Sequence, residues 1–129
     1  MYNEILLDRN AHPLHKGSLR DYTEKIPLIN AGCGDNLMLY LKIKDGVIAD
    51  GSFEGFGCAV SQASTDILLD EIIGKSPAEA RRLCEEFVKL FMNTPEELKK
   101  LGDVGALTDI SKMPARVNCA LLPWSALQR

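Results

Sequence analysis

The clearest pattern in the chain is a strict alternation of apolar and polar positions after residue 36. One face carries Leu37, Leu39, Leu41 and Ile43, and the other carries Met38, Tyr40, Lys42 and Lys44. A period of two predicts a β-strand with one buried and one wet face. Asp45-Gly46 then favours a type I′ turn, so the chain returns as a second strand through Val47 to Phe53. This hairpin brings residues near Asp35 beside residues near Gly57.

A helical period follows the hairpin. Residues 59–73 are predicted to form a helix that Gly74 closes. Its inward positions are Val60, Ala63, Ile67 and Leu68. Its outward positions are Ser61, Gln62, Asp66 and Asp70.

A helix N-terminal capping motif predicts a second helix after Gly74. Ser76 and Glu79 form a capping box around Pro77, which suits the first helical position. The apolar stripe behind it contains Ala80, Leu83, Cys84, Phe87, Val88 and Phe91. Because Cys84 lies within this stripe, we interpret it as a buried core thiol and leave it out of any site.

The first quarter of the chain gives weaker signals. Residues 2–11 suit a short amphipathic helix that His12-Pro13 terminates. His12 and His15 are interpreted as solvated loop residues, because nothing nearby repeats a ligand spacing. Residues 18–28 form either a loop or a first edge strand, and their polarity leaves that choice open.

The last quarter mixes helix starts and turns. Residues 94–101 carry the signals of a short charged helix, and residues 102–105 are predicted to turn the chain in a mobile region. Residues 120–128 are predicted as helix, in which Pro123 either kinks the helix or begins a new one.

Size and charge narrow the classes of function. At 129 residues and 46% hydrophobic content, the chain is sized for one domain, residues 1–129, with an ordinary core. A net charge of -3 argues against nucleic-acid binding, which needs a basic face. We find no leader-like segment in residues 1–10 and no apolar run near the ~18 residues of a membrane span, so no membrane role and a cytoplasmic location are expected.

The four cysteines carry the candidate chemistry. In a reducing compartment such thiols bind metal or act in catalysis more often than they pair as disulfides. No CxxC pair is present, so a site must be assembled by the fold. Cys33 is expected in a turn, with Asp35 two positions later on the same side of an extended segment. Cys58 and Cys119 are expected at helix starts, where unpaired N–H groups and the helix dipole favour a thiolate.

Several motifs give the chain a family resemblance that runs nearly end to end. The three cysteine motifs are Asn30-Ala31-Gly32-Cys33-Gly34-Asp35, Gly55-Phe56-Gly57-Cys58-Ala59-Val60-Ser61 with Ala63-Ser64, and Ala115-Arg116-Val117-Asn118-Cys119. The flanking segments are Ile5-Leu6-Leu7-Asp8 and Trp124-Ser125-Ala126-Leu127. With these motifs the chain resembles the SufU/IscU/NifU family of iron-sulfur cluster assembly proteins.

Within that family the chain is most similar to the SufU branch. The long stretch between Cys58 and Cys119 accommodates the extra helical segment of that branch, and Asn118 stands where IscU-type proteins carry a histidine. The resemblance implies an α+β fold, a small antiparallel β-sheet with helices packed on one side. It also implies a tetrahedral Zn²⁺ held by Cys33, Asp35, Cys58 and Cys119.

Three departures from the family pattern concern partners and loop stiffness. Residues 12–15 lack the arginine of the family's Asn-Pro-Arg-Asn-like turn, and Ala31 replaces a proline before the first cysteine motif. Residues 112–116 do not match the Leu-Pro-Pro-Val-Lys segment that IscU-type proteins present to a chaperone. We therefore expect no such chaperone partner.

The chemistry of the ligand set and the resemblance together favour sulfur transfer. Three thiolates and a carboxylate complete a zinc shell, and the harder oxygen ligand exchanges more easily than sulfur. A SufS-like, pyridoxal-phosphate cysteine desulfurase would present a persulfide to Cys33, with Cys119 as the competing acceptor. Arg116 would either stabilise the reacting thiolate or form a surface salt bridge or partner contact. The recipients would be apo-proteins or a SufBCD-type scaffold. Whether the protein itself counts as an enzyme is left open.

Two alternatives remain. The same four residues could hold a transient [2Fe-2S] cluster, which makes the protein a scaffold that transfers clusters to apo-proteins. The zinc could also be purely structural, which makes the protein a non-catalytic interaction module.

Overall fold

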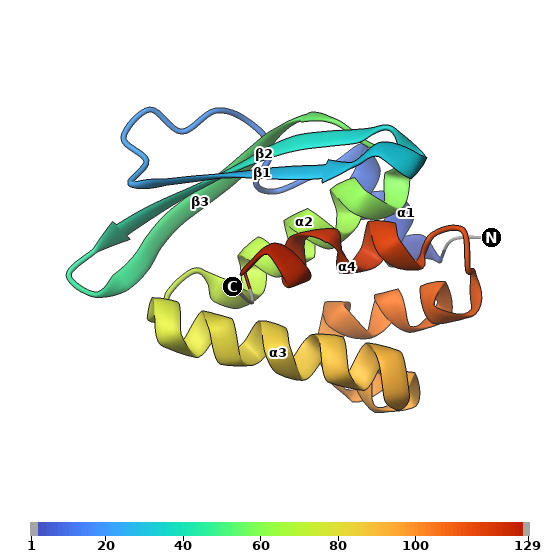
Figure 1. Cartoon of the computed structure of the whole chain (residues 1–129). Helices are drawn as coiled ribbons and strands as arrows, with labels where there is room; N and C mark the ends of the chain where they lie inside the picture. The colour runs from blue at the N-terminus through green and yellow to red at the C-terminus, as the bar shows by residue number, and fades with distance from the viewer. Residues whose placement is uncertain (1–2, 128–129) are drawn as a thin grey trace.

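The computed structural model describes residues 3–127, so the predicted start of the first helix at Tyr2 lies outside the described residues. Figure 1 shows the strands forming one layer with the helices on one side of it, which confirms the predicted α+β fold. The elements in chain order are α1 (Glu4–Ala11), β1 (Glu24–Asn30), the 3-10 helix η1 (Ala31–Cys33), β2 (Asp35–Lys44), β3 (Val47–Phe56), α2 (Ala59–Ile72), α3 (Pro77–Asn93), the 3-10 helices η2 (Pro95–Lys100) and η3 (Gly102–Lys112), and α4 (Val117–Leu127).

The sheet has the order β1-β2-β3, with both pairs antiparallel. The predicted type I′ hairpin is present, because Asp45 and Gly46 both have positive φ, 54° and 76°. The open choice for residues 18–28 resolves into an edge strand that begins at Glu24. β3 runs on to Phe56, beyond the predicted end, so the second cysteine motif leaves the sheet opposite Asn36.

The core lies between the sheet and the helices. On the apolar face of β2, Leu37, Leu39 and Leu41 are buried as predicted, whereas Ile43 is only partly buried. Trp124 on α4 stacks on Phe87 of α3 with ring centroids 3.9 Å apart. Cys84 is fully buried in the α3 stripe, and this burial raises the pKa of its thiol to about 12. The predicted capping box at Ser76 is also present.

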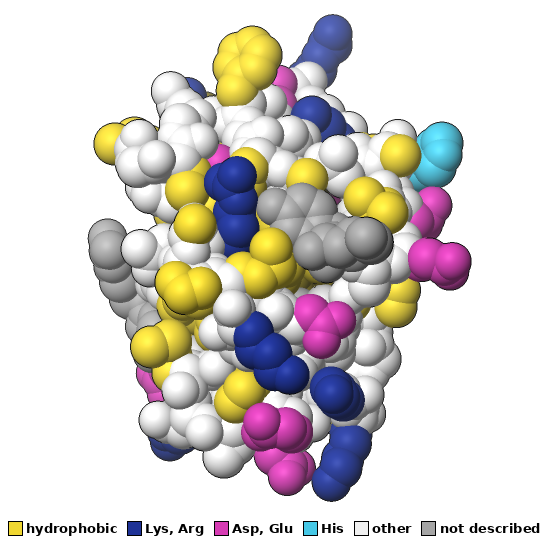
Figure 2. Space-filling model, turned by 90° about the vertical axis from the view of Figure 1, so that its right-hand side faces the viewer, with side chains coloured by type: hydrophobic (Ala, Val, Ile, Leu, Met, Phe, Trp, Pro, Cys, Tyr) yellow, Lys and Arg dark blue, Asp and Glu magenta, His cyan; other side chains and the backbone are white. Residues whose placement is uncertain are grey.

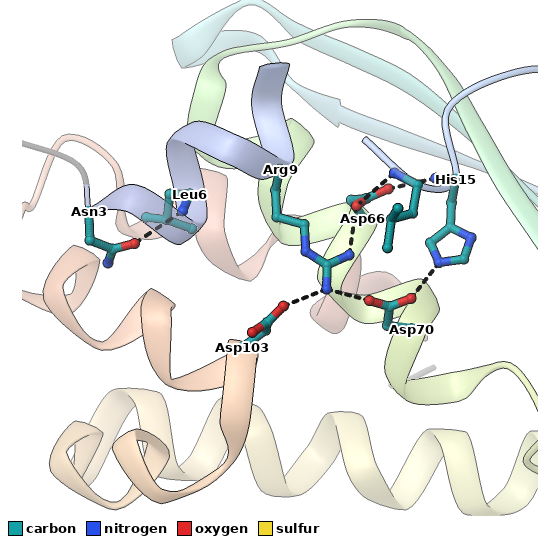
Figure 3. A network of polar contacts seen from close by, with 8 residues as sticks. Asn3, Leu6, Arg9, His15, Asp66, Asp70 and Asp103 are labelled. Carbon is teal, nitrogen blue, oxygen red and sulfur yellow. Dashed lines mark hydrogen bonds and ion pairs between the residues drawn. The ribbon is translucent and has the colours of Figure 1, made fainter. Parts of the chain in front are cut away.

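A buried arginine ties α1 to two other elements, as Figure 3 shows. Arg9 lies 2.8 Å from an Asp66 oxygen and 2.7 Å from an Asp103 oxygen, and it also pairs with Asp70. His15 contacts Asp70 through Nε2 at 2.6 Å. The prediction that Asp66 faces solvent is therefore wrong. His15 lies in a loop, as predicted, but its side chain is only partly exposed because the ring contacts Asp70. The side chains of Asp66 and His15 both belong to an arginine-carboxylate cluster that no local sequence pattern predicts.

The segment after α3 contains more helical structure than predicted. Residues 102–105 do not merely turn the chain but begin η3, which buries Val104, Leu107 and Ile110. These residues recur at every third position, which matches the three-residue turn of a 3-10 helix. Pro123 lies inside the continuous helix α4 and does not begin a new one. Among residues 3–127 the structure contains no helix that is both long and apolar enough to cross a membrane.

Candidate metal centre

Three separate segments bring potential ligands together at one end of the sheet. Cys33 lies in η1, Asp35 is the first residue of β2, and Cys119 lies in the first turn of α4. One ligand atom of each lies within 4.8 Å of the others. A tetrahedral metal with ~2.3 Å metal-sulfur bonds holds its sulfur atoms about 3.8 Å apart. The cluster is therefore compact enough for one metal ion after small side-chain movements.

Asp35 is the buried anchor of this cluster, with 1% of its surface exposed. Its Oδ1 atom accepts a hydrogen bond from the Cys58 backbone N–H at 2.8 Å and one from the Ser61 hydroxyl at 3.0 Å. Its Oδ2 atom has a longer contact of 3.5 Å with the Asn30 amide. One carboxylate oxygen is thus held firmly, and the other is the freer one for a metal.

Cys58 is the N-cap residue of α2, which confirms its predicted position at the mouth of a helix. Its sulfur accepts a hydrogen bond from the Ser61 backbone N–H at 3.4 Å. Cys58 does not belong to the compact group of three ligand atoms, but it lies close enough to Cys119 to influence the ionisation of that thiol. Cys58 is therefore next to the cluster, with its sulfur already oriented by the helix.

Cys119 lies at a helix start, as predicted, because it is the third residue of α4. Its side chain is also fully buried there. Burial raises the pKa of the Cys119 thiol far above its ordinary value, and the neighbouring Cys33, Cys58 and Asp35 raise it further. Several negative groups cannot ionise together in a dry site without a compensating cation. The donor set therefore fits a divalent metal, which holds coordinating thiols as thiolates.

Cys33 lies on the accessible side of the cluster and is half-buried. The 3-10 turn that holds it ends at Gly34, whose φ of 71° lies in the left-handed region that favours glycine. Its thiol donates a weak hydrogen bond to the Ala115 carbonyl at 3.6 Å. Arg116, the next residue, is half-buried in the turn before α4, and its N–H donates to the Met113 carbonyl at 2.8 Å.

Sequence reasoning missed two residues of the site. Ser61 was predicted to face solvent but is fully buried against Asp35. The Asn30 amide lies 3.7 Å from the Cys119 sulfur. Both residues stand inside the motifs that carry the family resemblance, and this was the available signal. The helical pattern failed for Ser61 because α2 is covered by α1, α4 and β3 and so lacks a simple wet face.

The sheet end beside the site exposes apolar side chains. Phe56 is 83% exposed, and Ile29 is also exposed; both pair with Asn36, so they flank it on the outer face of the sheet. Figure 2 views this end of the molecule and shows more hydrophobic side chains over its upper and middle parts than at its bottom, with charged side chains among them. Exposed apolar side chains grouped in this way are typical of an interaction surface.

The chain is similar to known proteins over almost its whole length. It is 41% identical to the protein named iron-sulfur cluster assembly scaffold protein IscU of Thermotoga maritima, over 99% of this chain and 90% of the relative. It is 33% identical to the zinc-dependent sulfurtransferase SufU of Bacillus subtilis, over 100% of this chain and 88% of the relative.

A solved structure with the same fold comes from Fervidobacterium islandicum AW-1 and is described as a candidate iron-sulfur cluster assembly scaffold protein for the SUF system. It superposes with a TM-score of 0.80 at 31% identity, and covers 98% of this chain and 93% of its own. The family described as the NifU-like N-terminal domain matches residues 1–120. Motifs, fold and relatives agree: the chain belongs to the NifU-like N-terminal domain family, and its homologues include proteins named IscU and SufU.

Proposed function

We propose that this protein, acting as one domain of residues 1–129, serves iron-sulfur cluster assembly in the cytoplasm by accepting persulfide sulfur from a SufS-like cysteine desulfurase. The observation that carries the proposal is the unequal exposure of the clustered groups. Asp35 and Cys119 are buried, whereas Cys33 and Cys58 are both half-buried. Cys58 is the N-cap of α2 and its sulfur accepts a hydrogen bond from the Ser61 backbone N–H, whereas Cys33 lies on a short turn that ends at Gly34. Cys33 is therefore the cysteine that a partner's persulfide can reach with least rearrangement.

The proposed metal is Zn²⁺, held by Cys33, Asp35, Cys58 and Cys119. When bound, zinc would supply the positive charge that keeps these thiols deprotonated at neutral pH. The 33% identical relative named a zinc-dependent sulfurtransferase supports this choice of metal. The burial of Asp35 and Cys119 would keep bulk water away from the inner ligands.

The proposed transfer is a thiol exchange. The Cys33 thiolate attacks the outer sulfur of the desulfurase persulfide, the sulfur-sulfur bond of that persulfide breaks, and the desulfurase cysteine leaves as a thiolate. Cys33 then carries the persulfide, and no oxidant or reductant is consumed. Arg116, in the turn next to Ala115, is proposed to stabilise the negative charge on sulfur during the exchange. The recipients are proposed to be apo-proteins or a SufBCD-type scaffold.

The acceptor can be identified directly. The zinc-loaded protein is incubated with a cysteine desulfurase and cysteine, persulfides are trapped by alkylation, and the modified peptide is mapped by mass spectrometry. We expect the extra sulfur on Cys33. A persulfide on Cys119, with Cys33 left as an unmodified thiol, would reject Cys33 as acceptor. Arg116→Gln should slow the exchange and leave the zinc content unchanged.

A second candidate function is a scaffold for a [2Fe-2S] cluster, which the 41% identical relative named as a scaffold supports. The cluster would then be cargo on the same four residues. The metal content and visible absorption of protein purified without oxygen, together with its effect on a desulfurase, distinguish these functions. Zinc together with desulfurase stimulation supports transfer, and visible charge-transfer bands support the scaffold. Zinc without any effect on a desulfurase leaves only a structural interaction module.

A further inference from the structure

We infer that Ser61 is a positioning residue for the metal centre: its hydroxyl fixes Oδ1 of Asp35, so that the carboxylate offers Oδ2 alone to the metal. The inference rests on the metal site of the proposed function, and it adds a residue that the ligand set does not contain. It concerns the hydrogen-bonded neighbours of the ligands, which orient them.

Ser61 contacts two of the four proposed ligands at once. Its hydroxyl lies 3.0 Å from Asp35 Oδ1, and its backbone N–H donates to the Cys58 sulfur at 3.4 Å. The side chain is fully buried, so water does not compete for these contacts. Ser61 thereby connects the first residue of β2 to the N-cap of α2.

The hydroxyl proton has two nearby acceptors, because the Cys58 carbonyl oxygen lies 3.1 Å from Ser61 Oγ. That carbonyl already accepts the helical hydrogen bond of the Gln62 N–H at 3.1 Å. A carboxylate is the stronger acceptor, since hydrogen bonds to charged groups are roughly twice as strong as neutral ones. The hydroxyl therefore donates to Asp35 when the carboxylate is ionised, as it must be to bind a metal.

The backbone is shaped to admit this contact. A Cβ atom added at Gly57 would lie 2.5 Å from Ser61 Oγ and 3.2 Å from Asp35 Oδ1. Any larger residue at position 57 would therefore push on both partners of the hydrogen bond. The glycine before Cys58 in the second motif has a specific purpose here, because it leaves room for the Ser61 hydroxyl beside the carboxylate.

The test compares zinc affinity by chelator competition in wild type, Ser61→Ala, Asp35→Ala and the double variant. Loss of a hydrogen-bonded neighbour of a ligand typically weakens metal binding about 10- to 100-fold. We expect such a loss in Ser61→Ala, and no further loss when the serine is removed from Asp35→Ala, because Ser61 acts through that carboxylate. The cobalt-loaded Ser61→Ala protein should also show shifted d–d absorption bands.

Ser64→Ala is the matched control, since Ser64 is a buried serine of the same helix whose hydroxyl bonds Ala120 and Trp124. It should keep wild-type zinc affinity and cobalt bands. The inference would be overturned if Ser61→Ala lowered zinc affinity equally in the wild-type and Asp35→Ala proteins. Wild-type zinc affinity in the single variant Ser61→Ala would overturn it as well.

If Ser61→Ala does not fold, Ser61→Thr decides the matter, because it keeps the hydroxyl. Folded Ser61→Thr with wild-type affinity and cobalt bands supports the inference, and a shift of both overturns it. Absence of zinc from wild type would instead refute the metal site of the proposed function.

Discussion

Two buried carboxylates at α2 have opposite electrostatic surroundings: Asp66 belongs to the helix, and Asp35 contacts its N-terminal end. Asp66 faces a cation of its own chain, because Arg9 lies 2.8 Å away and the backbone N–H of His15 adds a hydrogen bond at 2.8 Å. The hydrogen bonds that the structure shows for Asp35 come from neutral donors, the Cys58 N–H and the Ser61 and Asn30 side chains. Asp66 is thus neutralised by a cation of its own chain, whereas Asp35 is oriented by neutral donors and is proposed to bind an external cation. The difference separates a structural ion pair from a candidate metal ligand.

Removing Arg9 should have the largest effect on folding. In Arg9→Met, Asp66 becomes a buried charge without its cation, and Asp70 and Asp103 lose theirs at the surface. Breaking a buried ion pair by removing one partner costs about 3–5 kcal/mol, so urea unfolding should show a loss of this size.

The matched control for Arg9→Met is Lys42→Met, which breaks the exposed pair with Asp21. This variant should unfold almost like wild type. If Arg9→Met unfolded at the wild-type urea midpoint, the claim that the Arg9–Asp66 ion pair stabilises the fold would be wrong.

Asp35→Asn should produce the opposite behaviour. The metal-free variant should be at least as stable as metal-free wild type, because a buried charge is replaced by a neutral group of the same shape. Its zinc affinity should fall about tenfold or more, since a ligand matters at least as much as the groups that orient it. Thermal unfolding with and without zinc measures both effects. A variant that is destabilised without metal and still binds zinc tightly would make Asp35 a structural residue like Asp66.

The scaffold alternative gives Asp35 a second test. If its oxygen is the exchangeable ligand, Asp35→Ala should lengthen the lifetime of a reconstituted [2Fe-2S] cluster, because exchange at oxygen no longer starts its release. The decay of the visible absorption bands in wild type and variant gives this lifetime. Equal lifetimes, together with equal desulfurase stimulation, would leave the carboxylate without the proposed role.

The two fully buried thiols allow a smaller comparison of the same kind. Cys84→Ala should leave the zinc content unchanged and cost about 1 kcal/mol of stability, because only a small buried group is lost. Cys119→Ala should lose zinc. Since burial raises the pKa of Cys84 to about 12, its thiol should also resist alkylation at pH 8 in the folded protein. If Cys84→Ala lost zinc and Cys119→Ala retained it, Cys84 would be the zinc ligand and Cys119 the core thiol.

The smallest expected effect concerns acid stability. Burial alone would raise the pKa of Asp70, but hydrogen bonds from His15 and Arg9 outweigh it and lower the pKa below 3.8. A lowered folded-state pKa gives stability that is present above the unfolded value and is lost as the pH falls through the folded one. The stability difference between wild type and Asp70→Asn should therefore shrink below about pH 4. Because Asp70 is partly exposed, the difference should be small and should fall further in high salt.

Local patterns in the sequence were sufficient for most elements of the fold. The alternation of β2, the Asp45-Gly46 turn and the capping box at Ser76 depend on neighbours a few residues away, so the sequence predicts them directly. The four candidate ligands were also chosen from the sequence, partly from residue chemistry and partly from the family resemblance. Their role as ligands stays a prediction.

Tertiary structure alone decided how the buried polar groups are used. The sequence places Ser61 and Asp66 on the same expected wet face of one helix, and nothing local distinguishes their surroundings. The fold brings Arg9 and the backbone of residues 14–15 to Asp66, and it brings Asp35 to Ser61 across a turn and a hairpin. Burying a polar group is unfavourable unless a partner arrives from elsewhere in the chain, and only long-range packing determines which partner that is.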